Sequence, residues 1–174
     1  MKRFLTAALI LGAFTAPLQA ATPAEDEASI RQIVETFRVS LIKKDPATFL
    51  KLFYSESIPW IGVTTDKSLN REKAEKKDPK QPDPAKLYAS GNPRKFIEGI
   101  SKSKTAIEET FENVRVDSDG DVAQVWFDYS FNEAGYKANW GKESWHMVRT
   151  TDGWKISSVI WSMEFNPLPP PKRN

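Results

Sequence analysis

Three side chains in the last third of the chain are of types that can transfer protons: Asp128, Tyr129 and His146. His146 is the only histidine, and an imidazole titrates close to neutral pH, so it can act as a general base. Asp128 lies among aromatic residues, and removal from water would raise its pKa and suit it to acid–base work. His146 with Tyr129 or Asp128 could therefore support an isomerase or dehydratase type of reaction.

The residues around Asp128 and Tyr129 alternate between apolar and polar, which is typical of a strand with one buried face. The apolar face is formed by Ala123, Val125, Phe127, Tyr129 and Phe131. We expect Tyr129 to face the interior, where its hydroxyl either binds a ligand or is satisfied by the backbone. Asp128 belongs to the opposite face, which favours a solvated carboxylate. Trp126 shares that face and indicates a subunit contact.

His146 shares its strand face with Ser144, Val148 and Thr150, and the spacing assigns it no catalytic partner. A general base, a pocket hydrogen bond and a structural role all stay open for it. The charged residues of this region are Glu143, Arg149, Glu109, Glu112 and Arg115, which we expect to form solvated cross-strand ion pairs. Glu164, at the end of the last strand, either lies at the rim of a pocket or is simply exposed.

These residues lie on three alternating segments, Asp121–Phe131, Asn139–Thr150 and Trp154–Glu164, joined by short turns. The pattern predicts a twisted antiparallel sheet. A fourth strand, Thr105–Asp117, loses its alternation between Phe111 and Val114, which predicts a bulge. A short strand, Ser57–Thr64, contains Pro59, and we place it at an edge or bulge because proline lacks an amide hydrogen.

Cap signals predict the helices that cover this sheet. Thr22, Pro23 and Glu25 form a capping box at the start of a helix whose apolar stripe includes Phe37. Asp45-Pro46 and Asn92-Pro93 each begin a further short helix. Residues 65–91 are rich in charge and proline, and we expect a solvated, partly helical insert or flap near a pocket entrance. Residues 167–174 are a proline-rich tail, expected to be disordered.

The start of the chain predicts its compartment. Lys2 and Arg3, the apolar segment Phe4–Phe14 and a cleavage site after Ala20 are typical of a signal peptide spanning residues 1–20. We expect a periplasmic or secreted protein without a stable membrane anchor. Loss of Lys2 and Arg3 lowers the Lys and Arg count from 25 to 23, equal to the number of Asp and Glu, which argues against a nucleic-acid partner. With no cysteine and one histidine, neither a metal site nor a cofactor is predicted.

The order of these elements resembles the NTF2-like superfamily, with Gly153-Trp154-Lys155-Ile156 opening the last strand and Ile160-Trp161-Ser162 near its end. Within it, the chain is most similar to small SnoaL-like and lumazine-binding-like bacterial proteins. The resemblance covers Ala24 to Asn166 and implies an α+β cone, in which a strongly curved antiparallel sheet packs on two to three N-terminal helices. Residues 21–166 would form this domain, with a pocket at its wide end and homodimers formed through the sheet.

The residues that steroid-isomerase-like and epoxide-hydrolase-like members use are missing from the matching positions. Where steroid-isomerase-like members carry a tyrosine on the first helix, this chain has Phe37, and no aspartate follows Tyr54 and Glu56 before Asp66. The Asp–Arg–Asp relay of epoxide-hydrolase-like members cannot be assigned either. We therefore expect a domain without an evident catalytic constellation that binds a small, largely apolar or aromatic ligand. The expected ligand-binding residues are Trp60, Phe96, Phe127, Tyr129, His146 and Trp161. The alternatives are the proton-transfer enzyme above and a homodimeric protein-interaction module.

Overall fold

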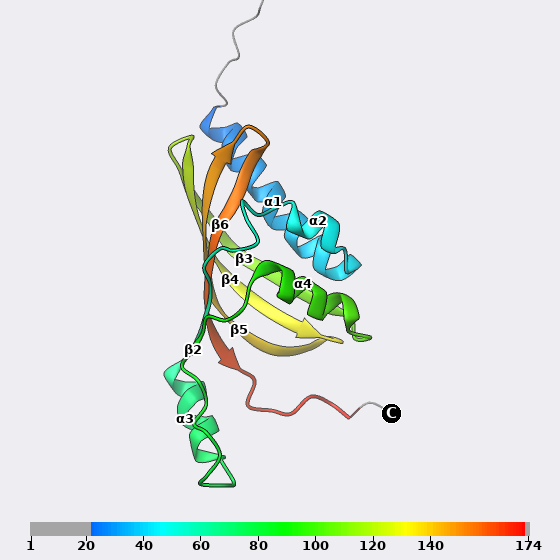
Figure 1. Cartoon of the computed structure of the whole chain (residues 1–174), viewed down its shortest axis with the longest axis vertical. Helices are drawn as coiled ribbons and strands as arrows, with labels where there is room; N and C mark the ends of the chain where they lie inside the picture. Colours follow the sequence, from blue (N-terminus) through cyan, green and yellow to red (C-terminus); the bar gives the residue numbers. More distant parts are fainter. Residues whose placement is uncertain (1–21, 173–174) are drawn as a thin grey trace, which may run out of the picture.

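The computed structural model describes residues 22–172, so the predicted signal peptide, residues 1–20, lies outside the described residues. A single curved sheet lies beside helices gathered on one of its faces (Figure 1). The elements are α1 (Pro23–Lys43), α2 (Pro46–Leu50), β1 (Trp60–Thr64), α3 (Asp66–Ala74), β2 (Leu87–Tyr88), α4 (Pro93–Lys102), β3 (Ile107–Ser118), β4 (Val122–Glu133), β5 (Tyr136–Thr150) and β6 (Gly153–Phe165).

The six strands follow the order β2-β1-β6-β5-β4-β3, and the sheet does not close into a barrel. β3 to β6 form the predicted antiparallel meander. β1 differs from that pattern, because it pairs in parallel with β6 and makes the sheet mixed. The expectation that β1 lies at an edge or bulge is wrong, because β1 pairs with β2 on one side and with β6 on the other, without a register shift. Pro59 is accommodated because it precedes the strand and uses only its carbonyl, which accepts a hydrogen bond from the amide of Val159. The bulge predicted between Phe111 and Val114 does occur, between Glu112 and Arg115, with Asn113 at φ 53°.

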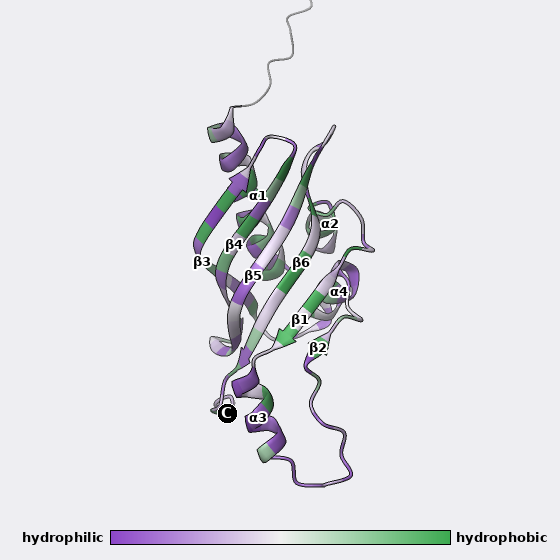
Figure 2. Ribbon diagram, turned by 90° about the vertical axis from the view of Figure 1, so that its left-hand side faces the viewer, coloured by the Kyte–Doolittle hydropathy of each residue, from purple (hydrophilic) through white to green (hydrophobic). Residues whose placement is uncertain are grey.

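The helices begin where their caps predict. Thr22 and Glu25 form the capping box of α1, and the side chains of Asp45 and Asn92 cap α2 and α4. Helices α1, α2 and α4 lie on the same side of the sheet, which leaves the opposite face uncovered (Figures 1 and 2). Phe37 of α1 is fully buried between the layers and contacts the rings of Phe49, Phe111 and Trp145 at centroid distances of 4.8, 5.8 and 5.0 Å. The two layers therefore share an aromatic core.

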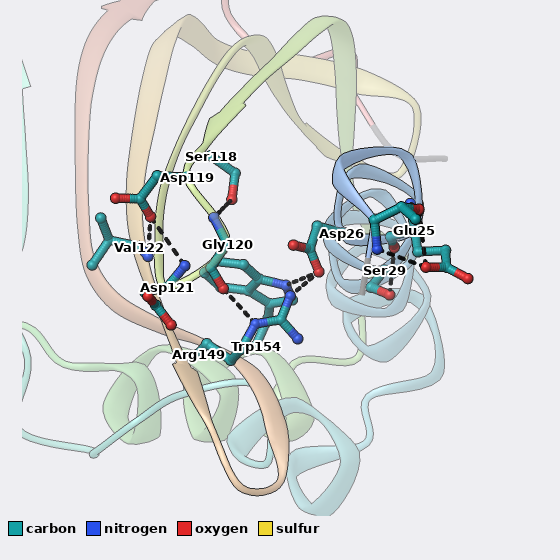
Figure 3. A network of polar contacts seen from close by, with 11 residues as sticks. Glu25, Asp26, Ser29, Ser118, Asp119, Gly120, Asp121, Val122, Arg149 and Trp154 are labelled. Atoms are coloured by element: carbon teal, nitrogen blue, oxygen red, sulfur yellow. Dashed lines mark hydrogen bonds and ion pairs between the residues drawn. The ribbon is translucent and has the colours of Figure 1, made fainter. Parts of the chain in front are cut away.

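The first turn of α1 is fixed to the far end of the sheet by a buried carboxylate (Figure 3). Asp26 is 3% exposed and accepts hydrogen bonds from the guanidinium of Arg149 and, at 3.3 Å, from the indole of Trp154. The guanidinium carbon of Arg149 also lies 4.7 Å from the Trp154 ring centroid. Arg149 further donates to the carbonyl of Gly120 in the β3–β4 turn. One arginine thus joins α1 to two strand ends.

The charged insert projects past one end of the sheet, and its β2 returns to pair with β1 (Figure 1). Its first part forms α3, which is held by Arg71: the guanidinium donates to the carbonyl of Phe165 at 2.6 Å and lies 3.4 Å from Glu164. Glu164, which the sequence places at a pocket rim or in solvent, is instead buried and also accepts from the Thr65 hydroxyl. Residues 167–172 form no helix or strand, and the carbonyl of Leu168 accepts a hydrogen bond from Tyr136 at 2.6 Å.

Candidate functional site

The helix-facing side of the sheet carries a cavity of about 180 Å³. Aromatic rings form most of its wall, joined by Val159 and Met163. The rings are those of Phe37, Trp60, Phe96, Tyr129, Phe131 and Trp161. They contact one another, with ring centroids 5.3 Å apart for Trp60 and Phe96 and 5.5 Å apart for Trp60 and Trp161. Because neighbouring rings restrain each other, the wall is preorganised for a flat or apolar ligand.

Two carboxyl groups, those of Glu109 on β3 and Glu143 on β5, also line the cavity. Glu109 is paired with Phe131, and Glu143 with Phe127, so the two glutamates lie on either side of β4. They are 4% and 3% exposed, and a side-chain hydrogen bond joins them. The indole of Trp145 donates a further hydrogen bond of 2.5 Å to Glu143. The expectation that both glutamates form solvated cross-strand ion pairs is wrong.

Burial makes these carboxyls reluctant to ionise. It raises the pKa of Glu143 to about 7, against the opposing effect of the hydrogen bonds from Trp145 and Glu109. Burial, the charge of Glu143 and the hydrogen bond to it raise the pKa of Glu109 well above its ordinary value. Burial thus raises the pKa of both carboxyls, and their closeness disfavours the state in which both are charged.

A third polar group in the cavity is the hydroxyl of Tyr129. It lies 2.9 Å from both the side-chain oxygen of Asn139 and the carbonyl of Ser162. Burial and the charges of Glu109 and Glu143 raise the pKa of Tyr129, so the phenol stays neutral and acts as a donor. The hydroxyl is thus satisfied within the protein, as one of the two sequence interpretations expected.

Among the expected ligand-binding residues, Trp60, Phe96, Tyr129 and Trp161 line the cavity. Phe127 is fully buried on the same face, next to Phe111 and Trp145, and packs in the core. His146 lies on the outer face, where its Nδ1 is 2.8 Å from the hydroxyl of Ser158. Asp128 is on the outer face as well and is paired with Lys142 and Asn113, which lower its pKa.

Neither His146 nor Asp128 therefore converges with Tyr129 on one point. The insert of residues 65–91, which was expected near the pocket entrance, contributes no residue to the cavity lining. Every described residue around the cavity comes from α1, α4 or strands β1, β3, β4, β5 and β6.

Within residues 22–172, no cluster of three or more histidine, aspartate or glutamate side chains could hold a metal ion. No helix in the same range is both long and apolar enough to cross a membrane.

The glutamate pair escaped the sequence prediction although a signal for it was present. Glu143 has the same strand parity as Trp145 and Met147, and Glu109 has the parity of Ile107 and Phe111, all of which pack toward the helices. Parity alone would have placed both carboxyls inside. The usual exposure of charged residues outweighed that signal.

Solved structures that superpose on most of this chain show its fold. An NTF2-like protein of unknown function from Shewanella baltica superposes with a TM-score of 0.57 and 15% identity, covering 84% of this chain and 99% of its own. The chain has the NTF2-like fold. An NTF2-like protein with a cystatin-like fold from Novosphingobium aromaticivorans gives a TM-score of 0.56 at 13% identity, covering 80% of this chain and 82% of its own.

A third NTF2-like structure, from Streptomyces avermitilis, is provisionally named a dehydratase. It superposes with a TM-score of 0.55 at 16% identity and covers 83% of this chain and all of its own. No protein-family model and no curated protein matches the sequence. The predicted α+β cone is thus confirmed. At these identities the similarity shows the fold, and the chemistry has to be argued from the cavity.

Proposed function

We propose that this NTF2-like domain binds a small, largely apolar or aromatic ligand in the cavity between α4 and the sheet. The observation that carries the proposal is a cavity of about 180 Å³ whose wall consists mainly of aromatic rings. An apolar cavity of roughly 150 Å³ is large enough to bind benzene. The expected ligand is therefore about the size of one six-membered ring with a short substituent.

Two neighbouring residues of β6 allow this proposal to be tested with a matched pair of variants. Val159 lines the cavity, whereas Ile160 points to the outer face and is 38% exposed. Val159→Phe is expected to fill the cavity and abolish binding of benzyl alcohol, while Ile160→Phe is expected to leave the affinity within about threefold of the parent. Isothermal titration calorimetry gives the affinities, and circular dichroism confirms that each variant is folded. Failure of every single-ring compound to bind the parent protein would overturn the proposal.

A second candidate is proton transfer of the isomerase or dehydratase type. The observation in its favour is the buried pair of Glu109 and Glu143, whose two interacting carboxyl groups both line the cavity. Such a pair can give and accept a proton near neutral pH. Deuterium exchange next to the carbonyl of cyclohexanone, lost in Glu143→Gln, would support this candidate; exchange equal to that in buffer would exclude it for this compound.

We also propose that the uncovered face of the sheet mediates a homodimer. Trp126, Ser144 and Ile160 are directly paired across β4, β5 and β6, and Trp126 and Ile160 are 39% and 38% exposed. Val122, 54% exposed, lies on the same face of β4. Dimerisation would remove this apolar row from water.

Trp126→Glu is expected to shift the protein to monomer in sedimentation velocity, because burying the new carboxylate would cost more than the contact returns. Gln32→Glu, at an exposed position of α1 on the other side of the sheet (Figure 1), is the control for added charge. Identical sedimentation of Trp126→Glu and the parent protein would count against this interface.

The proposal that the protein acts in the periplasm or outside the cell rests on residues 1–20 of the sequence alone.

A further inference from the structure

The acidic groups of the cavity differ from the other buried carboxylates in lacking a positive partner. Asp26 is paired with Arg149, and Glu164 lies beside Arg71 and Lys67. Glu109 and Glu143 instead hydrogen bond to each other, and no lysine, arginine or histidine of the described chain lines their cavity. Burial of a negative charge without a countercharge is costly. If Glu109 and Glu143 had only a structural role, uncharged side chains of similar size would serve equally well.

The aromatic rings reinforce the negative character of this space. The face of an aromatic ring attracts cations, most strongly for tryptophan. Trp60 and Trp161 lie 5.5 Å apart, and Phe96 contacts Trp60 at 5.3 Å, all within the wall that also contains Glu109 and Glu143. The side-chain oxygen of Asn139 adds another partial negative charge, already engaged by Tyr129. The carboxyl groups and the rings therefore both favour a positively charged ligand.

From this arrangement we infer that the ligand is a small organic cation. A protonated amine or quaternary ammonium group would lie against Glu109 and Glu143, and its apolar body would lie among Trp60, Phe96 and Trp161. The inference rests on the proposed function, since it assigns the ligand class of the same cavity. It excludes anions, because an anion would face an ionised carboxylate without a neutralising group. The cavity volume of about 180 Å³ limits the ligand to one ring or a compact tetraalkylammonium.

Three probes of nearly equal size and different charge test this inference: benzylammonium, benzyl alcohol and benzoate. At pH 7.5 benzylammonium is expected to bind at least about tenfold more tightly than benzyl alcohol, since a cation against rings and a carboxylate gains in a desolvated site. Benzoate is expected not to bind. Calorimetric titration of the full chain measures all three affinities.

Glutamine variants then assign the preference to the carboxyl pair. Glu143→Gln is expected to lower the benzylammonium affinity at least about tenfold while keeping that for benzyl alcohol within about threefold. Glu112→Gln, on the exposed face of β3, is the control and should leave both affinities unchanged. Circular dichroism and retained binding of benzyl alcohol show that the Glu143→Gln cavity is intact.

The outcomes separate the two proposals. If benzyl alcohol binds as tightly as benzylammonium, or if Glu143→Gln leaves their ratio unchanged, the cation inference is overturned while ligand binding stands. If none of the three probes binds the parent protein, both the inference and the proposed function fail. A tenfold preference that disappears in Glu143→Gln supports both.

Discussion

Glu143→Gln is expected to stabilise the protein at alkaline pH and to flatten the dependence of its stability on pH. Burial raises the pKa of Glu143 from 4.5 to about 7, so between these values the folded chain binds a proton that the unfolded chain has released. This contribution to stability is complete below about pH 4.5 and is lost as the pH rises through about 7. At about 1.4 kcal/mol per pH unit, the loss amounts to roughly 3 kcal/mol. Glutamine keeps the shape of the side chain and does not ionise.

Urea unfolding followed by circular dichroism between pH 5 and pH 8.5 measures this effect. The parent should lose stability steadily across that range, and Glu109→Gln should show a smaller slope, since the pKa of Glu109 is raised as well. Glu112→Gln, which changes an exposed glutamate on the same strand as Glu109, should follow the parent. A parent protein equally stable at pH 5 and pH 8 would mean that the two carboxyls are solvated or separated in solution.

Asp26→Ala is expected to destabilise the protein by about 2–3 kcal/mol. The substitution leaves the indole of Trp154 without its acceptor and Arg149 without its carboxylate, in a region where Asp26 is 3% exposed. Removing one member of a fully buried ion pair costs about 3–5 kcal/mol. The side chain of Arg149 is 32% exposed, so water recovers part of that cost.

The control is a second carboxylate on the same helix. Glu27 is paired with Arg31 one turn away, and both side chains are about half exposed, at 48% and 46%. Glu27→Ala should change the free energy of unfolding by no more than about 0.5 kcal/mol. Equal effects of the two substitutions would show that the Asp26–Arg149 contact does not anchor α1. Chemical unfolding at pH 7 and 25 °C compares the two variants directly.

The fold was largely predictable because its signals are local. Alternation along β4 identified its buried face, and Thr22, Asp45 and Asn92 marked three helix starts through side-chain caps. The bulge near Asn113 was visible as a break in the alternation. The parallel pairing of β1 with β6 was not visible, because it joins segments about a hundred residues apart and depends on how the helices cover the sheet.

The cavity was predictable in its walls and not in its chemistry. Four of the six residues expected to line it do so: Trp60, Phe96, Tyr129 and Trp161. Phe127 lies in the core and His146 on the outer face, because strand alternation alone does not show how far along the inner face the cavity extends. Glu109 and Glu143 were expected in solvent, because charged side chains seldom occupy an interior. Only the three-dimensional structure shows that strands on either side of β4 bring the two carboxyls together.

The most direct test of the cavity uses the two methionines of the described sheet. The side chain of Met163 lines the cavity, whereas Met147 is buried outside its lining. In a protein labelled with ¹³C at the methionine methyl groups, titration with benzylammonium is expected to shift the Met163 signal saturably, through the ring current of the bound ligand, and to leave Met147 in place. A Met163 signal that does not move at saturating benzylammonium or benzyl alcohol would contradict a ligand site between α4 and the sheet.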